Sequence, residues 1–390
     1  MHCGIEFEYL LIDLGGATPA RLRDFSNLPF EQISAWLEDK PGRDDAELAT
    51  GDLGIKRGYW YLEGNERFHD DGRFRTLDVK GVEIRTPPAA DVETALRRLL
   101  AIETQLSAAL ARHGLGFAIA AFNPVRAPYA YDPPLNAWET AMRAEHRAYD
   151  GSHISTLSYG PDINLSMPGW SNAQCLDATR KLQHYAPWIV PFSFASPFAH
   201  GRRWPGWSKR THERAPLRQA VKLFLDAQAL AAPELASTLV HPARIAREVG
   251  RIEFKAFDAM PDLAVLRGCC HLLVGVCLAN NLSARSEIAD VARYQRAARI
   301  GFADAQLREG AEQLLTSARA RPAPGLSGAT MRLMRCGPSS SGGSTSRAGV
   351  ESTGAGGDVA DLGAATVMDV SFRTMTYGAI GAGTSRAMVP

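Results

Sequence analysis

Four segments of the chain alternate apolar residues with polar or charged ones, which is the pattern of a β-strand with one buried face. Alternate side chains of a strand share a face, so each segment presents its polar residues on one side. In chain order these residues are Glu6 and Glu8; Glu83 and Arg85; Asp162, Asn164 and Ser166; and Glu253 and Lys255, followed by Asp258. If the four strands are neighbours, their polar faces line one cavity rich in carboxylates and cationic groups.

A single strand such as residues 4–11 also fits a sheet with one solvated face, where Glu6 and Glu8 would need no further explanation. An ordinary solvated face favours Thr, Lys, Gln and Ser, whereas acids dominate all four segments. Carboxylates placed side by side repel one another, and a divalent cation removes that repulsion. Together the segments favour a site for Mg²⁺ and nucleotide phosphates over a wet sheet face.

Helical spacing of apolar residues separates these strands. Asp91 is placed to cap a helix that ends near residue 113, with Leu96, Leu99 and Leu106 on one stripe. A further strand is predicted at 116–122, and further helices at 29–40, 136–150, 172–184, 216–230, 261–282, 287–299 and 303–320. Strands mostly separated by helices, with their polar faces gathered into one site, predict an α+β fold.

Composition narrows the function without deciding it. The 390 residues include 43 basic and 42 acidic ones, a formal net charge of +1, so no global field attracts nucleic acid or an anionic membrane. The apolar stretch at 261–282 is interrupted by Arg267 and His271 and predicts a buried helix rather than a membrane span. The six cysteines form no Cys-x-x-Cys pair and the N-terminus has no signal-peptide pattern, so we expect a soluble, cytoplasmic protein with reduced thiols.

The composition changes near Cys336, and this predicts two regions. Residues 1–335 form the catalytic domain, and residues 336–390 are rich in Gly, Ser and Ala without a sustained period. Two interpretations of this tail stay open: a disordered low-complexity segment, or the product of a reading-frame shift in a GC-rich gene. Neither interpretation places function in the tail.

Five blocks of the sequence, in the same order, resemble the glutamate–cysteine ligase family in its carboxylate–amine ligase branch. Residues 4–11 resemble its opening Gly-x-Glu-x-Glu strand, and residues 82–88 its acid followed by Thr-Pro. Residues 196–202 resemble a Ser-Pro-Phe-x-x-Gly-Arg signature, and 294–307 contain an Arg-Ala-Ala-Arg-x-Gly core. The block at 244–258 keeps an Arg, Gly250, Glu253-Phe254-Lys255 and Asp258 at the family's spacing.

The resemblance implies a fold like that of glutamine synthetase: a curved, mainly antiparallel sheet that forms a funnel-shaped active site and is backed by helices. It also implies an ATP- and Mg²⁺-dependent ligase that joins a carboxylate to an amine through an acyl phosphate, as in γ-glutamyl-cysteine formation for glutathione biosynthesis. The site residues that follow are Glu6, Glu8, Glu83 and Glu253 for Mg²⁺, Lys255 and Arg202 for phosphate, Arg244 for the nucleotide or the substrate carboxylate, and Asn164, Ser166 and Arg85 for nucleotide binding.

The sequence departs from the family at two positions. Asp162 stands where many members have His, and Lys255 where most have Arg, so glutamate and cysteine are not fixed as the substrates. Residues 52–66 have no counterpart; we expect a surface hairpin there, with an acceptor pocket as the alternative. A non-catalytic relative that binds Mg²⁺–ATP is the second hypothesis, and a metal-dependent hydrolase the third. The expected partners are small molecules, not nucleic acid or a membrane, and a homo-oligomer is left open.

Overall fold

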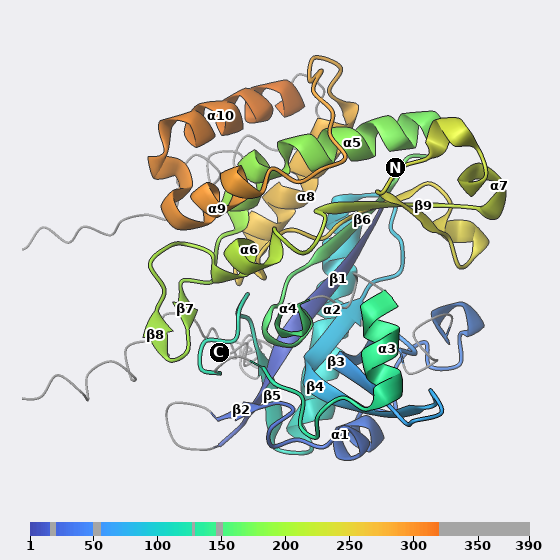
Figure 1. Ribbon diagram of the computed structural model, residues 1–390, viewed down its shortest axis with the longest axis vertical. Coiled ribbons are helices and arrows are strands. Elements are labelled where there is room, and N and C mark those ends of the chain that lie inside the picture. Colours follow the sequence, from blue (N-terminus) through green and yellow to red (C-terminus); the bar gives the residue numbers. More distant parts are fainter. Residues whose placement is uncertain (16–20, 50–55, 127–128, 146–150, 320–390) are drawn as a thin grey trace, which may run out of the picture.

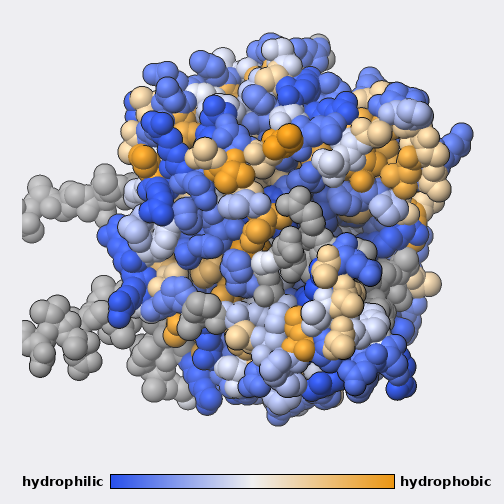
Figure 2. Space-filling model, in the orientation of Figure 1, coloured by the Kyte–Doolittle hydropathy of each residue, from blue (hydrophilic) through white to orange (hydrophobic). Residues whose placement is uncertain are grey.

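The computed structural model describes residues 1–15, 21–49, 56–126, 129–145 and 151–319 (Figure 1). The predicted tail at 336–390 lies outside the described residues. Figure 1 shows a sheet that crosses the molecule, with α5, α8, α9 and α10 at one end and α1 and α3 near the other. On the face shown in Figure 2, hydrophobic residues occur in small groups among hydrophilic ones.

The main sheet is built around the first strand, β1 (His2–Asp13). Its order is β10-β9-β11-β6-β1-β4-β3, and β2 and β5 pair with the second half of β1. These strands are β2 (Leu22–Arg23), β3 (Trp60–Phe68), β4 (Phe74–Arg85), β5 (Leu115–Ala118), β6 (Asp162–Ser166), β9 (Val221–Leu225), β10 (Val240–Pro242) and β11 (Arg251–Phe254). Among the described strands of this sheet, β9 and β10 pair in parallel and the other pairs are antiparallel. The predictions of an α+β fold and a mainly antiparallel sheet are confirmed.

The sheet is backed by α-helices. They are α1 (Phe30–Trp36), α2 (Val92–Ala111), α3 (Ala137–Glu145), α4 (Ser152–Leu157), α5 (Asn172–Ile189), α6 (Lys209–Arg214), α7 (Ala227–Leu230), α8 (Leu263–Leu278), α9 (Val291–Ile300) and α10 (Ala305–Arg319). Helix α2 packs on β1 and α5 packs on β9, while α8 contacts α2, α5 and α10. Asp91 caps α2 by accepting a hydrogen bond from the amide of Thr94, as predicted. Within the described residues, no helix is long and apolar enough to cross a membrane.

The helix predicted at 216–230 is wrong in its central part. Residues 221–225 form β9, which pairs with β10 and β11, and only the four-residue α7 follows it. The local apolar spacing fits a helix, but pairing on both sides satisfies the backbone of this segment within the sheet. This strand brings Lys222 opposite Glu253.

The two faces of β1 differ as the alternation predicts. Ile5, Phe7 and Tyr9 are buried in the core, whereas Glu6 and Glu8 are only partly buried on the other face. Burial of a side chain such as Ile5 or Phe7 contributes about 1.5–3 kcal/mol to folding. The apolar face therefore fixes the register, and the register fixes where the acids lie.

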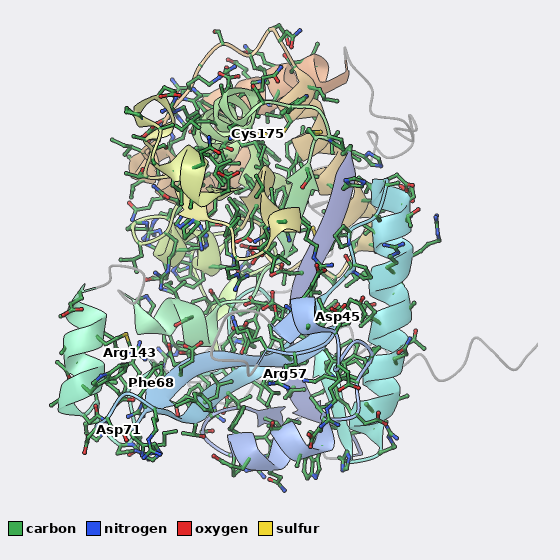
Figure 3. The ribbon with its side chains drawn as sticks, turned by 90° about the vertical axis from the view of Figure 1, so that its right-hand side faces the viewer. Asp45, Arg57, Phe68, Asp71, Arg143 and Cys175 are labelled. Carbon is green, nitrogen blue, oxygen red and sulfur yellow. The ribbon has the colours of Figure 1, made fainter. Side chains whose placement is uncertain are left out.

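Helix α3 closes the far end of the sheet beside β3. Arg143 donates a hydrogen bond to the carbonyl of Glu66 at 2.9 Å, and Arg67 pairs with the buried Glu139 at 2.8 Å. Figure 3 shows Arg143 and Phe68 at this end of the molecule, whereas Cys175 on α5 lies at the opposite end. The polar face of the sheet lies between these two ends.

Candidate active site

The four acid-bearing strands are consecutive neighbours in the sheet, in the order β11-β6-β1-β4. Glu6 lies opposite Arg85 on one side and Asp162 on the other. Glu8 lies opposite Glu83, and Glu253 lies opposite Asn164. The polar residues of the four segments therefore share one surface, as the sequence predicts for neighbouring strands.

Two groups of carboxylates on this surface are close enough to hold a cation. Glu6, Glu83 and Asp162 form one group, and Glu8, Glu63 and Glu83 form the other. In each group one oxygen per residue lies within 4.8 Å of the others, and Glu83 belongs to both. Carboxylate oxygens are the ligands that Mg²⁺ and other hard cations prefer, so the donor set fits the metal that the sequence implies.

Glu83 has the least compensated charge of the described acids on this surface. It is 4% exposed, and no Lys or Arg of the described residues forms an ion pair with it. Burial, followed by the nearby carboxylates of Glu63 and Glu6, raises the pKa of Glu83 well above its usual value. A bound cation would remove this penalty at the residue that both groups share.

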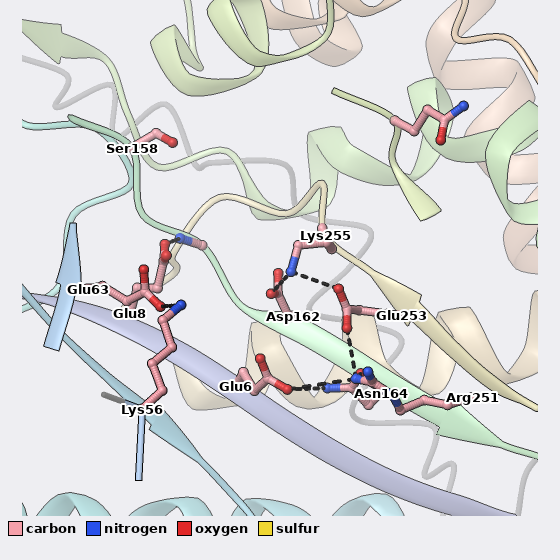
Figure 4. A network of polar contacts seen from close by, with 12 residues as sticks. Glu6, Glu8, Lys56, Glu63, Ser158, Asp162, Asn164, Arg251, Glu253 and Lys255 are labelled. Atoms are coloured by element: carbon pink, nitrogen blue, oxygen red, sulfur yellow. Dashed lines mark hydrogen bonds and ion pairs between the residues drawn. The ribbon is translucent and has the colours of Figure 1, made fainter. Parts of the chain in front are cut away.

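Ammonium groups hold several of these carboxylates; Figure 4 shows Lys56 beside Glu63 and Lys255 beside Asp162 and Glu253. Lys80 pairs with Glu8, whose other oxygen accepts a hydrogen bond from the amide of Gly160 at 2.8 Å. Lys56 pairs with Glu63. Burial alone would raise the pKa of Glu63, but Lys56 and Lys80 outweigh it and lower that pKa to about 2. Glu8 and Glu63 are therefore held in position by these contacts.

Lys255 connects Asp162 with Glu253. Its ammonium forms an ion pair with Asp162 and a second one with Glu253 at 2.8 Å, and Arg251 holds the other oxygen of Glu253 at 2.8 Å. Burial opposes ionisation of Glu253, yet Lys255 and Arg251 keep its pKa far below the usual value. The structure thus places Glu6, Glu8 and Glu83 in the carboxylate groups, whereas Glu253 belongs to neither group and is paired with cations.

A cavity of about 680 Å³ opens beside Glu6. The structure brings four of the residues predicted to contact the nucleotide or substrate to its wall: Asn164, Ser166, Arg85 and Arg244. Trp170 and Met167 add apolar surface to the same wall. Cavities of this size and mixed lining are typical of small-molecule sites.

Arg85 and Arg202, which the resemblance assigns to nucleotide and phosphate binding, have other contacts in the structure. Arg85 donates to the carbonyls of Gly58 at 2.7 Å, of Lys56 at 3.0 Å and of Leu48, so it holds the backbone that borders the cavity. Arg202 is exposed on β8 (Arg202–Arg203), which pairs only with β7 (Phe198–Ala199) in a separate two-stranded sheet. The structure does not bring Arg202 onto the carboxylate surface.

Sequence reasoning did not assign a metal role to two members of the groups. Asp162 is predicted on a polar strand face and as a departure from the family, and Glu63 lies in the segment 52–66 expected to be a surface hairpin. Residues 60–68 form β3, a mostly buried strand that makes a hairpin with β4 in the main sheet and places Tyr61 opposite Glu83. The alternation of Tyr61 and Glu63 with Trp60 and Leu62 is the signal that could have found this strand.

Comparison with known proteins identifies the family. A model of the glutamate-cysteine ligase family 2 (GCS2) matches residues 3–217, more than half of the chain. The glutamate–cysteine ligase EgtA of Mycobacterium tuberculosis, from two strains, is 28% identical over 131 residues, a match that covers 32% of this chain. The match spans 29% of the length of EgtA.

Several solved structures are similar over 86% of this chain. A bifunctional glutathione synthetase from Pasteurella multocida is 14% identical, with a TM-score of 0.42 and 49% of its own chain covered. The ligase PafA, in complex with the prokaryotic ubiquitin-like protein Pup, is 14% identical, with a TM-score of 0.40 and 62% of that chain covered. A glutamine synthase homolog is 12% identical, with a TM-score of 0.33 and 65% of that chain covered.

Proposed function

We propose, because the chain belongs to the glutamate-cysteine ligase family 2, that it is an ATP- and Mg²⁺-dependent ligase that joins a carboxylate to an amine. The observation that carries this proposal is the shared position of Glu83 in two groups of three carboxylates. A buried acid among other acids destabilises the fold unless a cation offsets it. This arrangement supports a bound cation at the site, and the adjoining cavity of about 680 Å³ supports a nucleotide beside it.

The two groups divide the metal ligands of the proposed site. Glu6, Glu83 and Asp162 would hold one Mg²⁺, and Glu8, Glu63 and Glu83 a second. When bound, Mg²⁺ would neutralise phosphate oxygens and so lower the repulsion between ATP and an anionic substrate. Lys80, Lys56 and the amide of Gly160 orient the ligands of the second group before any ion arrives.

The cavity supplies the nucleotide side of the proposed site. Asn164 and Ser166 of β6 and Arg244 line this cavity, and Trp170 offers an aromatic surface for a base. Lys255 lies between Asp162 and Glu253, where its ammonium can offset charge on a transferring phosphoryl group. Arg202 stays a prediction for phosphate contact.

The proposed reaction has two balanced steps. A carboxylate oxygen of the substrate attacks the γ-phosphorus of ATP, ADP leaves, and an acyl phosphate forms. The amine nitrogen then attacks the acyl carbon, the phosphate leaves, and the nitrogen loses a proton, giving the amide. Because the chain belongs to this family, glutamate and cysteine are the first substrate pair to test. We place the reaction in the cytoplasm, where ATP is supplied.

The test is ADP release by the purified protein with ATP and Mg²⁺, with and without an acid and amine pair. Glutamate with cysteine is tested first, then a panel of amino acids and amines. We expect release that depends on the amine and is lost in Glu83→Gln. Glu103→Gln is the matched control, since Glu103 is 3% exposed but lies behind the sheet, bonded to Tyr9. Amine-dependent release that persists in Glu83→Gln would contradict the proposed site.

The second candidate is a non-catalytic relative that binds Mg²⁺–ATP. The observation in its favour is that Lys255 is held by both Asp162 and Glu253 and is not free to move toward a phosphate while both pairs persist. This candidate predicts saturable Mg²⁺–ATP binding in calorimetry with no ADP release for any substrate pair. Turnover with a single pair would reject it.

A further inference from the structure

Arg210 is a buried cation next to the carboxylate surface that the proposed function does not use. It lies on α6 and is 4% exposed, and its Nη2 donates to the carbonyl of Lys255 at 3.2 Å. Its Nε and Nη1 are buried and have no hydrogen-bond partner among the described residues. Unfilled donors on a buried charge cost stability. Burial raises the pKa of Asp258, and the charge of Arg210 opposes that rise, so the guanidinium offsets part of the cost of burying this carboxyl.

The first contact of Arg210 is with Gly160. A Cβ added at Gly160 would lie 2.6 Å from Cζ of Arg210, so the guanidinium packs directly on the glycine backbone. The amide of Gly160 donates to Glu8 at 2.8 Å. The position of Arg210 therefore limits the position of the backbone donor that orients Glu8, a member of the second carboxylate group.

The second contact of Arg210 is with the backbone of Lys255. The side chain of Lys255 pairs with Asp162, a member of the first carboxylate group. Arg210 thus touches the backbone of two residues, and each of these bonds a carboxylate of a different group. Within the described contacts, it links the supports of both groups from behind the surface.

The scaffold around α6 keeps Arg210 in place. Asp258 is fully buried and accepts hydrogen bonds from the hydroxyls of Ser196 and Ser208, both at 2.8 Å. The hydroxyl of Ser208 in turn accepts the amide of Thr211 at 2.9 Å and caps α6. A capped helix anchored to a buried carboxylate holds its side chains more rigidly than a free loop does.

We propose that Arg210 is a positioning residue for both carboxylate groups, an inference that rests on the proposed metal site. It sets the backbone of Gly160 and Lys255, and through them it sets the oxygens of Glu8 and Asp162 at the separation that a cation requires. Its substitution leaves every proposed metal ligand in place but loosens their geometry.

The test is calorimetric titration of the metal-free, nucleotide-free protein with Mn²⁺ as the probe. We expect Arg210→Met to weaken Mn²⁺ binding about tenfold, the lower end of the effect seen when supports of metal ligands are removed. Arg214→Met is the matched control. Arg214 is a buried arginine on the same helix, but it donates to the carbonyls of Arg218 and Gln219. We expect this control to lower Tm while leaving Mn²⁺ affinity within twofold of the parent.

Two further variants keep the test decisive where Arg210→Met folds poorly. Arg210→Lys keeps a charge near the carbonyl of Lys255 but lacks the flat group that packs on Gly160, so an intermediate affinity is expected. Gly160→Ala, with Arg210 intact, is expected to weaken Mn²⁺ binding as well. Unchanged affinity in Arg210→Met or in both of these variants would overturn the positioning role alone. Absence of Mn²⁺ binding by the parent protein would overturn the proposed metal site itself.

Discussion

Glu83 and Glu253 are carboxylates on the same face of one sheet, 4% and 5% exposed, in opposite electrostatic surroundings. Glu253 has Arg251 and Lys255 each at 2.8 Å, whereas the charged neighbours that dominate around Glu83 are acids. Burial raises the pKa of both groups, but the two cations reverse this effect at Glu253, and the nearby carboxylates add to it at Glu83. The protein thus supplies positive charges that pair with Glu253 but supplies none that pairs with Glu83 within the described residues.

This difference indicates which carboxylate would gain most from a bound cation. Around Glu253 the protein carries its own cations, so a metal there would have to displace Lys255 or Arg251. Glu83 forms no ion pair among the described residues, although its neighbours Glu63 and Asp162 are paired with Lys56 and Lys255. Glu83 and Glu253 are the same residue type on the same face of the sheet, but they differ in whether a Lys or Arg pairs with them.

The largest effect on Mn²⁺ affinity is expected when Glu83 is replaced by Gln, and Glu253→Gln is the comparison. Glu83→Gln removes a ligand from both groups, so Mn²⁺ affinity should fall at least 100-fold, roughly 2.7 kcal/mol. Glu253→Gln should change Mn²⁺ affinity by less than about fivefold, or roughly 1 kcal/mol. Calorimetric titration of both variants measures this, and equal losses in the two would erase the distinction between the regions.

A smaller effect is expected from Lys255→Met. This variant leaves Asp162 and Glu253 without the ammonium they share, and breaking a buried pair from one side is destabilising. The side chain of Lys255 is 26% exposed, so we expect a loss of about 2 kcal/mol rather than the larger values of fully buried pairs. Urea denaturation measures it. Lys222→Met is a control on the neighbouring strand, and a loss as large as that of Lys255→Met would argue for a general charge effect.

Next in size is a gain in the stability of the metal-free protein when Glu83 is replaced by Gln. The pKa of Glu83 is higher in the folded than in the unfolded chain, and burial raises that of Asp162 to about 6. Between their usual and raised pKa values the folded state binds more protons, so the free energy of unfolding falls as pH rises through this interval. Glu83→Gln removes the buried charge and should raise the metal-free Tm at pH 8 by about 1–1.5 °C, near 1 kcal/mol for a chain of this length.

Differential scanning calorimetry measures this predicted rise in Tm and can also contradict it. If Glu83→Gln melts below the parent protein in EDTA at pH 8, the carboxylate is compensated within the chain and the contrast with Glu253 is lost. Added Mg²⁺ should raise the Tm of the parent protein more at pH 8 than at pH 6, because protons compete for the same oxygens at the lower pH.

The smallest effect is expected at an exposed pair near the cavity. Arg247 and Glu47 form an ion pair at 2.6 Å, and both side chains are more than 40% exposed. Because solvent screens such pairs, Arg247→Ala should change the free energy of unfolding by less than about 0.5 kcal/mol. A loss near that of Lys255→Met would show that burial does not set the strength of charge pairs on this surface.

The sequence predicted the acid-bearing strands because alternation has a direct physical cause. Ile5 and Phe7 must face the core, so Glu6 and Glu8 must face the other way, and no tertiary information is needed. The same argument applies to Glu83. Glu63 was missed because the adjacent aromatic residues Trp60 and Tyr61 make the alternation at the start of β3 hard to recognise.

The charge balance could not be predicted in the same way. Whether Glu253 is free or paired depends on the reach of Lys255 and Arg251 and on the strands beside β11, one of which, β9, was expected to be a helix. The resemblance placed Arg202 near phosphate, but the order of residues does not show how the short β7–β8 hairpin that carries Arg202 is oriented relative to the main sheet. Neither the surroundings of Glu253 nor those of Arg202 can be derived from residue spacing.

The position of β1 at the centre of the sheet sets an order of events during folding. Glu6 is hydrogen-bonded to Asn164, 158 residues later in the chain, and such distant pairing is slow because a long loop must close first. Until β6 docks, the first strand has no partner on that side and Asp162 is missing from the first carboxylate group, whereas the second group needs only β1, β3 and β4. Metal binding at the first group should therefore appear late in refolding, after helix α2 and the β3–β4 hairpin, whose contacts are local. A metal-sensitive probe would report the last closure of the sheet rather than the first collapse of the chain.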